Sequence, residues 1–201
     1  MANLSWKTTT AQMYRGVLIY SLCGVAASIL APIISAAAVA SFVNGGGSFS
    51  GGSFGLLSII NLLLGLAILA GYILFFLGLK DFRGVVNTAD VPAVGKIYTA
   101  VILNIVGYFL KLIPVISIVG GILNLVAFIL MLIGFAALKN STTFPGLART
   151  GASKLFVAMI LSLVGAVLGW IPVIGILGAI CNIVAFVMTI LGWKSIADAE
   201  A

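Results

Sequence analysis

The chain has 201 residues, of which 63% are apolar and only 7% are charged, with ten Lys or Arg against four Asp or Glu. A soluble domain has about a quarter of its residues charged and about half apolar, so this composition excludes a soluble globular enzyme. It also excludes intrinsic disorder, which requires low hydrophobicity and high charge. The remaining class is an all-α, polytopic integral membrane protein whose helices span a bilayer.

Six apolar segments can cross the hydrocarbon core, which takes about 20 helical residues. In chain order they cover 14–32, with a possible continuation to 43, then 55–79, 97–113, 115–138, 155–171 and 173–193. The first apolar run, 16–38, exceeds the roughly 7–15 residues of a signal-peptide core, so we expect a retained helix. The third and fifth segments reach roughly 25 Å, which just suffices. A re-entrant hairpin is less favoured, because it would leave polar backbone in lipid.

Proline residues open the fourth and sixth segments, at Pro114 and Pro172. Proline suits the first position of a helix, where its missing N–H has no partner to lose. The connections are so short that the joined helices must be antiparallel neighbours. The sequence therefore predicts tight helical hairpins that turn at these prolines.

The positive charges predict the orientation of the chain. Nine basic residues fall on one side of the predicted topology: Lys7, Arg15, Lys80, Arg83, Lys96, Lys139, Arg149, Lys154 and Lys194. Lys111 alone falls on the other side. By the positive-inside rule both termini are cytoplasmic. We interpret the net charge of +6 as a topology signal with weak attraction to anionic lipid at the cytoplasmic face, rather than as nucleic-acid binding. A prokaryotic inner membrane is the expected location, and an organellar membrane the alternative.

An internal repeat divides the single transmembrane domain, 1–201. Residues 96–134 and 154–192 align without a gap, and 19 of the 39 aligned positions are identical. We expect three related helical hairpins, at about 14–80, 96–139 and 154–194. The first copy is diverged and has an extra outer segment, 33–54. The start of this segment either lengthens the first helix or lies along the membrane surface, and we expect a flexible loop at 44–55.

Polar side chains recur near the middle of the predicted spans. In chain order they are Ser21, Asn61, Asn104, Asn124, Ser162 and Asn182. Those of the second and third hairpins lie about ten residues from the turn, or roughly 15 Å deep. The favoured interpretation is interhelical hydrogen bonding, worth about 0.6–2 kcal/mol for each bond. The alternative is a polar belt that lines a solute site.

Small residues recur on the same helices and indicate close packing. The candidate packing glycines are Gly24, Gly107, Gly120, Gly165, Gly169 and Gly178. Glycine at an interface lets two helix backbones approach closely. This pattern indicates tight packing within the bundle more strongly than it indicates oligomerisation.

Several catalytic and cofactor chemistries are excluded by composition. The chain has no His, and Cys23 and Cys181 stand alone in apolar stretches, so the usual zinc, haem and iron–sulfur ligand sets are missing. Ser-His and Cys-His catalysis are excluded for the same reason. All four carboxylates lie outside the predicted spans, which removes the usual proton relay of a coupled transporter. We expect no cofactor, no metal and no enzymatic activity. Trp6, in a polar N-terminal arm, could dock on the cytoplasmic membrane surface.

Two functions fit these observations. The first is a non-enzymatic structural or scaffold subunit that self-associates or joins a larger membrane complex, with 33–52 as the best candidate contact surface. The alternative is a transporter or channel for a small solute without ion coupling, because internal repeats and mid-membrane polar residues are typical of transporters.

Overall fold

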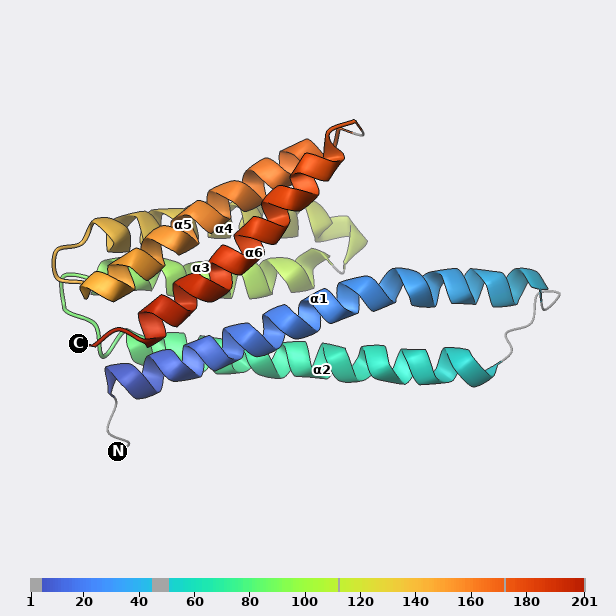
Figure 1. Ribbon diagram of the computed structural model, residues 1–201, viewed down its shortest axis with the longest axis horizontal. Helices are drawn as coiled ribbons and strands as arrows, with labels where there is room; N and C mark the ends of the chain where they lie inside the picture. The colour runs from blue at the N-terminus through green and yellow to red at the C-terminus, as the bar shows by residue number, and fades with distance from the viewer. Residues whose placement is uncertain (1–4, 45–50, 112, 172, 201) are drawn as a thin grey trace. The chain divides into compact units, whose positions relative to one another are not determined.

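A computed structural model describes residues 5–44, 51–111, 113–171 and 173–200, and every regular element in these ranges is helical. The elements, in chain order, are α1 (Trp6–Asn44), α2 (Gly51–Phe82), α3 (Val91–Lys111), η1 (Pro114–Ile116), α4 (Ser117–Asn140), α5 (Gly146–Gly169) and α6 (Gly175–Ala197) (Figure 1). Six of these helices are long and apolar enough to cross a membrane. The predicted all-α membrane class is therefore confirmed.

The helices extend beyond the predicted apolar spans at their charged ends. α3 begins at Val91, six residues before the predicted span, and α5 begins at Gly146, nine residues before it. The added turns carry Lys96, Arg149 and Lys154. Hydropathy detects the segment that prefers lipid, whereas the backbone hydrogen bonds of a helix continue into the polar interface, where long basic side chains reach water.

The outer segment 33–54 is largely helical where the structure describes it. α1 continues without interruption to Asn44. The start of the extra segment therefore lengthens the first helix, which was the first of the two predicted alternatives. The expected loop at 44–55 is wrong for Gly51–Gly55, which form the start of α2. Three of these five residues are glycine, and the helix that they begin continues into strongly apolar turns. Residues 45–50 lie outside the described part.

The chain forms two compact units. The larger consists of Met1–Tyr14 and Phe76–Ala201, and the smaller of Arg15–Phe75. In the larger unit α3 packs on α4, α4 on α5 and α5 on α6. Its core consists mainly of small and aliphatic side chains near the charged helix ends, among them Val94, Ile97, Ala100, Leu138 and Ala152.

Most large apolar side chains face outward. Leu125, Ile129, Val167 and Ile183 are exposed along the lengths of their helices, and Trp170 is 90% exposed beside the turn that follows α5. A soluble domain rarely exposes so continuous an apolar surface. The lipid tails of a bilayer would cover it, which is the arrangement of an integral membrane protein.

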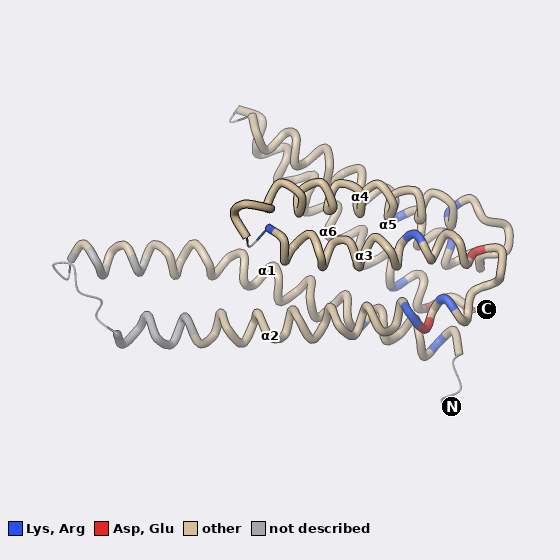
Figure 2. The backbone as a smooth tube through the Cα atoms, turned by 180° about the vertical axis from the view of Figure 1, so that it is seen from behind, with Lys and Arg blue, Asp and Glu red and all other residues tan. Residues whose placement is uncertain are grey.

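The charged residues of the larger unit gather at one end. They occupy the starts of α1, α3 and α5 and the ends of α2, α4 and α6, and because these helices alternate in direction they meet at the end that carries both termini (Figure 2). Lys111 lies at the opposite end, in the last turn of α3. We call the crowded side the charged end.

Candidate functional site

Two glycines of α5 and α6 bring these helices into backbone contact. A Cβ atom on Gly165 would lie 2.8 Å from the carbonyl oxygen of Gly178, and one on Gly178 would lie 2.7 Å from the carbonyl oxygen of Gly165. Either position is too close for any side chain. The amide of Asn182 fills the adjoining space, since the same Cβ on Gly165 would stand 2.6 Å from Asn182 Oδ1.

The same arrangement joins α3 and α4. A Cβ on Gly120 would lie 2.5 Å from the carbonyl oxygen of Gly107, and a Cβ on Gly107 would collide with Oδ1 of Asn124. That oxygen is buried and accepts no conventional hydrogen bond in the described part of the chain. The Cα–H of Gly107 that takes the place of a side chain points toward it, which is the geometry of a weak Cα–H···O contact.

These contacts show what the two Asn side chains of the repeat pack against. Asn124 and Asn182 each lie against a glycine of the neighbouring helix in their own pair, so each amide takes part in the packing of that pair. Such Cα–H···O contacts are worth about 0.5–1 kcal/mol each. The stronger interhelical hydrogen bonds expected for these amides stay a prediction.

A second close contact lies nearer the charged end in α3–α4 and in α5–α6, and a contact of the same kind joins α1 and α2. The Cβ position of Gly192 is 3.0 Å from the carbonyl oxygen of Gly151, and that of Gly134 is 3.0 Å from the carbonyl oxygen of Ala93. In the smaller unit the Cβ position of Gly71 is 2.9 Å from the carbonyl oxygen of Gly16. Local contacts of one kind therefore recur between α1 and α2, α3 and α4, and α5 and α6.

The sequence pattern did not predict the role of these inner contacts. The recognisable repeat begins at Lys96, three residues after Ala93, and therefore leaves out this position and its counterpart Gly151. Gly134 and Gly192 end the two repeated ranges, and Gly71 stands at the same distance after Asn61, yet none of the three is a predicted contact residue. Their recurrence ten residues after an Asn was the signal that could have identified them.

The polar and glycine residues of the first pair are arranged differently. A Cβ on Gly24 would meet no atom within 4 Å, Asn61 is exposed, and Ser21 is half-buried. The Asn–Gly contact made by the other two pairs is thus absent between α1 and α2. The reason is register: Gly24 lies eight residues after Gly16, whereas Gly107 lies fourteen after Ala93. The difference of six residues moves Gly24 about 9 Å along the helix and turns it by about 120°.

The remaining predicted residues differ in their surroundings. Asn104 is half-buried and Ser162 is exposed. Gly169 contributes backbone to the α5–α6 contact, because a Cβ on Gly178 would lie 2.8 Å from its nitrogen. Pro114 opens the short helix η1, as its position predicted. Pro172 lies outside the described residues.

Trp6 is buried within the protein, and its expected docking on the membrane surface is wrong. Its indole Nε1–H donates to the carbonyl oxygen of Ile196 at 3.2 Å, and its ring meets Phe82 and Phe144 edge-on at centroid distances of 5.0 and 5.6 Å. The preceding prediction treated residues 5–10 as a polar arm. They begin α1 instead, and the helical period places Trp6, Thr10 and Met13 on one buried side.

A buried carboxylate joins two connections of the larger unit. Asp90, which precedes α3, accepts hydrogen bonds from Ser141 Oγ at 2.5 Å and from Thr143 Oγ1 at 2.8 Å, both in the α4–α5 connection. The carbonyl oxygen of Asp90 also accepts from Val94 N at 3.1 Å in the first turn of α3. A negative charge at the start of a helix is favourable. Asp90 therefore ties two loops at the charged end.

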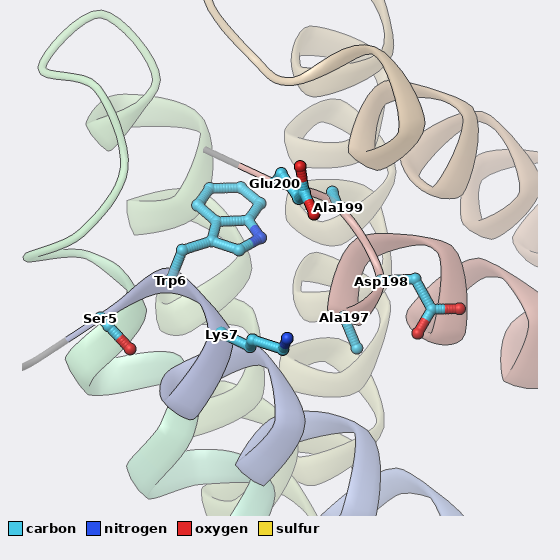
Figure 3. Close-up of a pocket in the computed structure, with 7 residues that line it drawn as sticks. All are labelled: Ser5, Trp6, Lys7, Ala197, Asp198, Ala199 and Glu200. Atoms are coloured by element: carbon cyan, nitrogen blue, oxygen red, sulfur yellow. The ribbon is translucent and has the colours of Figure 1, made fainter.

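A small cavity lies beside the chain ends in the larger unit. It encloses about 250 Å³ and is lined by Ser5, Trp6, Lys7, Ala197, Asp198, Ala199 and Glu200. The indole of Trp6 forms one wall, and Lys7 extends toward the segment that carries the two carboxylates (Figure 3). The Ser5 hydroxyl lies 3.0 Å from Thr8 Oγ1 rather than against a carboxylate, so the lining offers charge and an aromatic face but no activated nucleophile.

Metal-ligating residues do not cluster in the described ranges, where no three His, Cys, Asp or Glu side chains come together. Both thiols are free and half-buried. Comparisons with protein-family models, curated proteins and solved structures found no match to this chain.

Proposed function

We propose that this protein is a non-enzymatic structural subunit of a membrane assembly and that it self-associates through its first two helices. The observation that carries the proposal is the lack of burial along the smaller unit. Between residues 18 and 70, no side chain that the structure describes is buried. Helices in lipid gain stability by packing on other helices. The long exposed stretch of α1 and α2 supports contact with further protein.

The lengths of α1 and α2 support the same conclusion. With 39 and 32 residues, these helices measure about 58 and 48 Å, against a hydrocarbon core of about 30 Å. α3 to α6 have 21–24 residues, which suits a single crossing. The distal part of α1 exposes Ile33, Val39 and Val43. Apolar surface that extends past the lipid tails favours a protein partner.

The proposed orientation follows from the charges. The charged end carries basic residues from every helix, and the positive-inside rule favours the cytoplasm for this end. We place both termini there, in a prokaryotic inner membrane, with anionic lipid headgroups as neighbours of the basic side chains. The distal ends of α1 and α2 would then lie on the outer side.

The test is the mass of the particle after detergent-free extraction in native lipid. We expect the wild type to have a mass of two or more chains, and a variant that lacks residues 36–54, in which both exposed helices are shorter, to form a weaker assembly. The deletion leaves 30 residues of α1 and 28 of α2, more than the roughly 20 that one crossing needs, so both spans survive and the residues at the junction can form the turn. A wild type that is monomeric in native lipid, with a deletion that changes nothing, would contradict the proposal.

One observation favours the alternative, a channel or transporter for a small uncharged solute. Asn124 Oδ1 is buried without a hydrogen-bond donor, and an unsatisfied polar atom at a helix contact is an available acceptor. Solute flux into proteoliposomes tests this possibility. Flux that the double substitution Asn124→Leu, Asn182→Leu abolishes would support a pathway, whereas flux that is unchanged would exclude these residues as its site.

A further inference from the structure

We propose that two copies of this chain pair through the α1–α2 face that carries Gly24 and Asn61, with Asn61 of each copy packed on Gly24 of the other. The inference rests on the proposed self-association and names its contact. It starts from a difference between the helix pairs. The Asn–Gly contact is made within α3–α4 and within α5–α6, but in α1–α2 both of its members are left without a partner in the described part of the chain.

Gly24 and Asn61 lie at nearly the same depth. The contact between Gly16 and Gly71 places these two glycines at one level of the α1–α2 pair. Gly24 lies eight residues, or about 12 Å, from that level, and Asn61 lies ten residues, or about 15 Å, in the same direction. A twofold axis along the membrane normal keeps depth unchanged. It can therefore bring Asn61 of one copy opposite Gly24 of the other, which the register within one chain prevents.

The two residues also lie on the same side of the pair. At 3.6 residues per turn, Gly24 is turned by about 80° from the direction in which Gly16 faces α2. Asn61 is turned by about 80° from the direction in which Gly71 faces α1. Because the helices are antiparallel and right-handed, both rotations lead to one face of the pair. We call this face the Gly24–Asn61 face.

Several small side chains lie on this face beside Gly24 and Asn61, together with Ile68 of α2, and small residues allow close helix contact. The same rotation places Ser28 and Ser35 of α1 and Gly65 of α2 on it, and all three are exposed. Both hydroxyls are already satisfied by their own helix, since Ser28 Oγ donates to Val25 O and Ser35 Oγ to Ala31 O. The opposite side carries large aliphatic residues that suit lipid tails: Leu22, Ile29, Ile33, Ile59, Leu63 and Leu66.

Charge and area indicate that the occupant is a second copy. Residues 16–79 contain no charged residue, so an ionic partner surface would find no counter-charge there. A second Gly24–Asn61 face matches the first in length, polarity and depth. Two adjacent helices about 45 Å long and about 10 Å wide offer roughly 900 Å². That is above the roughly 800 Å² that each partner contributes to a standard interface.

Disulfide cross-linking in native-lipid particles tests the contact directly. In a background with Cys23→Ser and Cys181→Ser, a tagged chain with Gly24→Cys is co-expressed with an untagged chain with Asn61→Cys. Mild oxidation should join the two chains into a covalent heterodimer. Ala26→Cys is the matched control, because position 26 is turned to the opposite side of α1, and it should give no product with Asn61→Cys.

Leucine substitutions supply an independent measurement. Gly24→Leu and Asn61→Leu should each raise the dissociation constant of the dimer by roughly tenfold or more. Each should leave unfolding of the single chain unchanged, because Gly24 has open space around it and Asn61 is exposed. Gly121→Leu is the control, since a Cβ on Gly121 also meets no atom within 4 Å, and it should leave dimerisation unchanged.

The outcomes distinguish the Gly24–Asn61 contact from self-association in general. A heterodimer that forms at Gly24 and not at Ala26, with weaker dimers for both leucine variants, supports the contact. A multimeric wild type that neither cross-links at these positions nor responds to the leucines overturns the contact and leaves self-association in place. A wild type that is monomeric in native lipid overturns both.

Discussion

Oδ1 of Asn182 lies so close to Gly165 that a Cβ atom on this glycine would stand 2.6 Å from it. The amide of one helix thus occupies the space that a side chain on the other would need. The two residues are seventeen positions apart, on opposite sides of a tight turn, and the same relationship links Asn124 with Gly107. Pairing a polar side chain with a glycine gives α3–α4 and α5–α6 a defined register.

Substitution of Gly165 by Leu should weaken the α5–α6 contact. The new side chain would collide with Asn182 Oδ1 and with the carbonyl oxygen of Gly178, and overpacking of this kind costs about 1–3 kcal/mol. The free energy of unfolding in mixed micelles titrated with SDS measures the effect. Gly121→Leu has open space around it and should be close to neutral. Equal losses for both variants would show that leucine acts through lipid rather than through this contact.

Replacement of Trp6 by Ala should destabilise the larger unit by about 3–5 kcal/mol, because the indole fills a buried position against Phe82 and Phe144. Trp6→Phe keeps an aromatic ring and loses the hydrogen bond to Ile196, so its loss should be smaller. Thermal unfolding of the purified protein compares the two variants. Stability unaffected by Trp6→Ala would instead indicate an indole that lies outside the core.

The Asp90–Thr143 hydrogen bond should appear as an interaction energy in a double-mutant cycle. Asp90→Asn and Thr143→Val each break a bond at the buried carboxylate, and bonded neighbours usually couple by about 0.5–3 kcal/mol. The four unfolding free energies of the wild type, both single variants and the double variant give this energy. The pair Asp81→Asn and Thr143→Val is a control that should be additive, because no bond joins these side chains. Additivity for Asp90 as well would contradict the proposed link between the loops.

The proposed orientation predicts which positions react with a membrane-impermeant maleimide. In a background without Cys23 and Cys181, Val115→Cys should be labelled in intact cells, because Val115 is 89% exposed at the end away from the charges. Thr8→Cys, exposed at the charged end, should be labelled only after permeabilisation. The reverse pattern would invert the topology.

Much of the architecture could be predicted from local sequence. The spans that contain Asn104 and Asn182 are predictable because a helix needs a fixed apolar length to cross a bilayer. The position of Pro114 at the start of a helix is predictable because proline lacks the N–H that a later position in the helix would need. The equivalence of Asn124 and Asn182 followed from the repeat, and the structure places both in the same kind of contact. These features depend on the chain within a few turns, where hydropathy and backbone geometry are decisive.

Other features depended on how two helices are rotated and aligned. Gly24 and Gly107 are both predicted packing glycines, but a Cβ on Gly24 would meet no atom of α2, because the inner contact of Gly16 with Gly71 sets a register six residues different. Trp6 lies within a polar sequence and is nevertheless buried, because residues distant in the chain meet around it. The sequence by itself determined the membrane class, the spans and the segregation of charge, through composition and length. Tertiary structure alone decided which glycines touch and which remain open, because helix phase and register are set by pairs of backbones in contact.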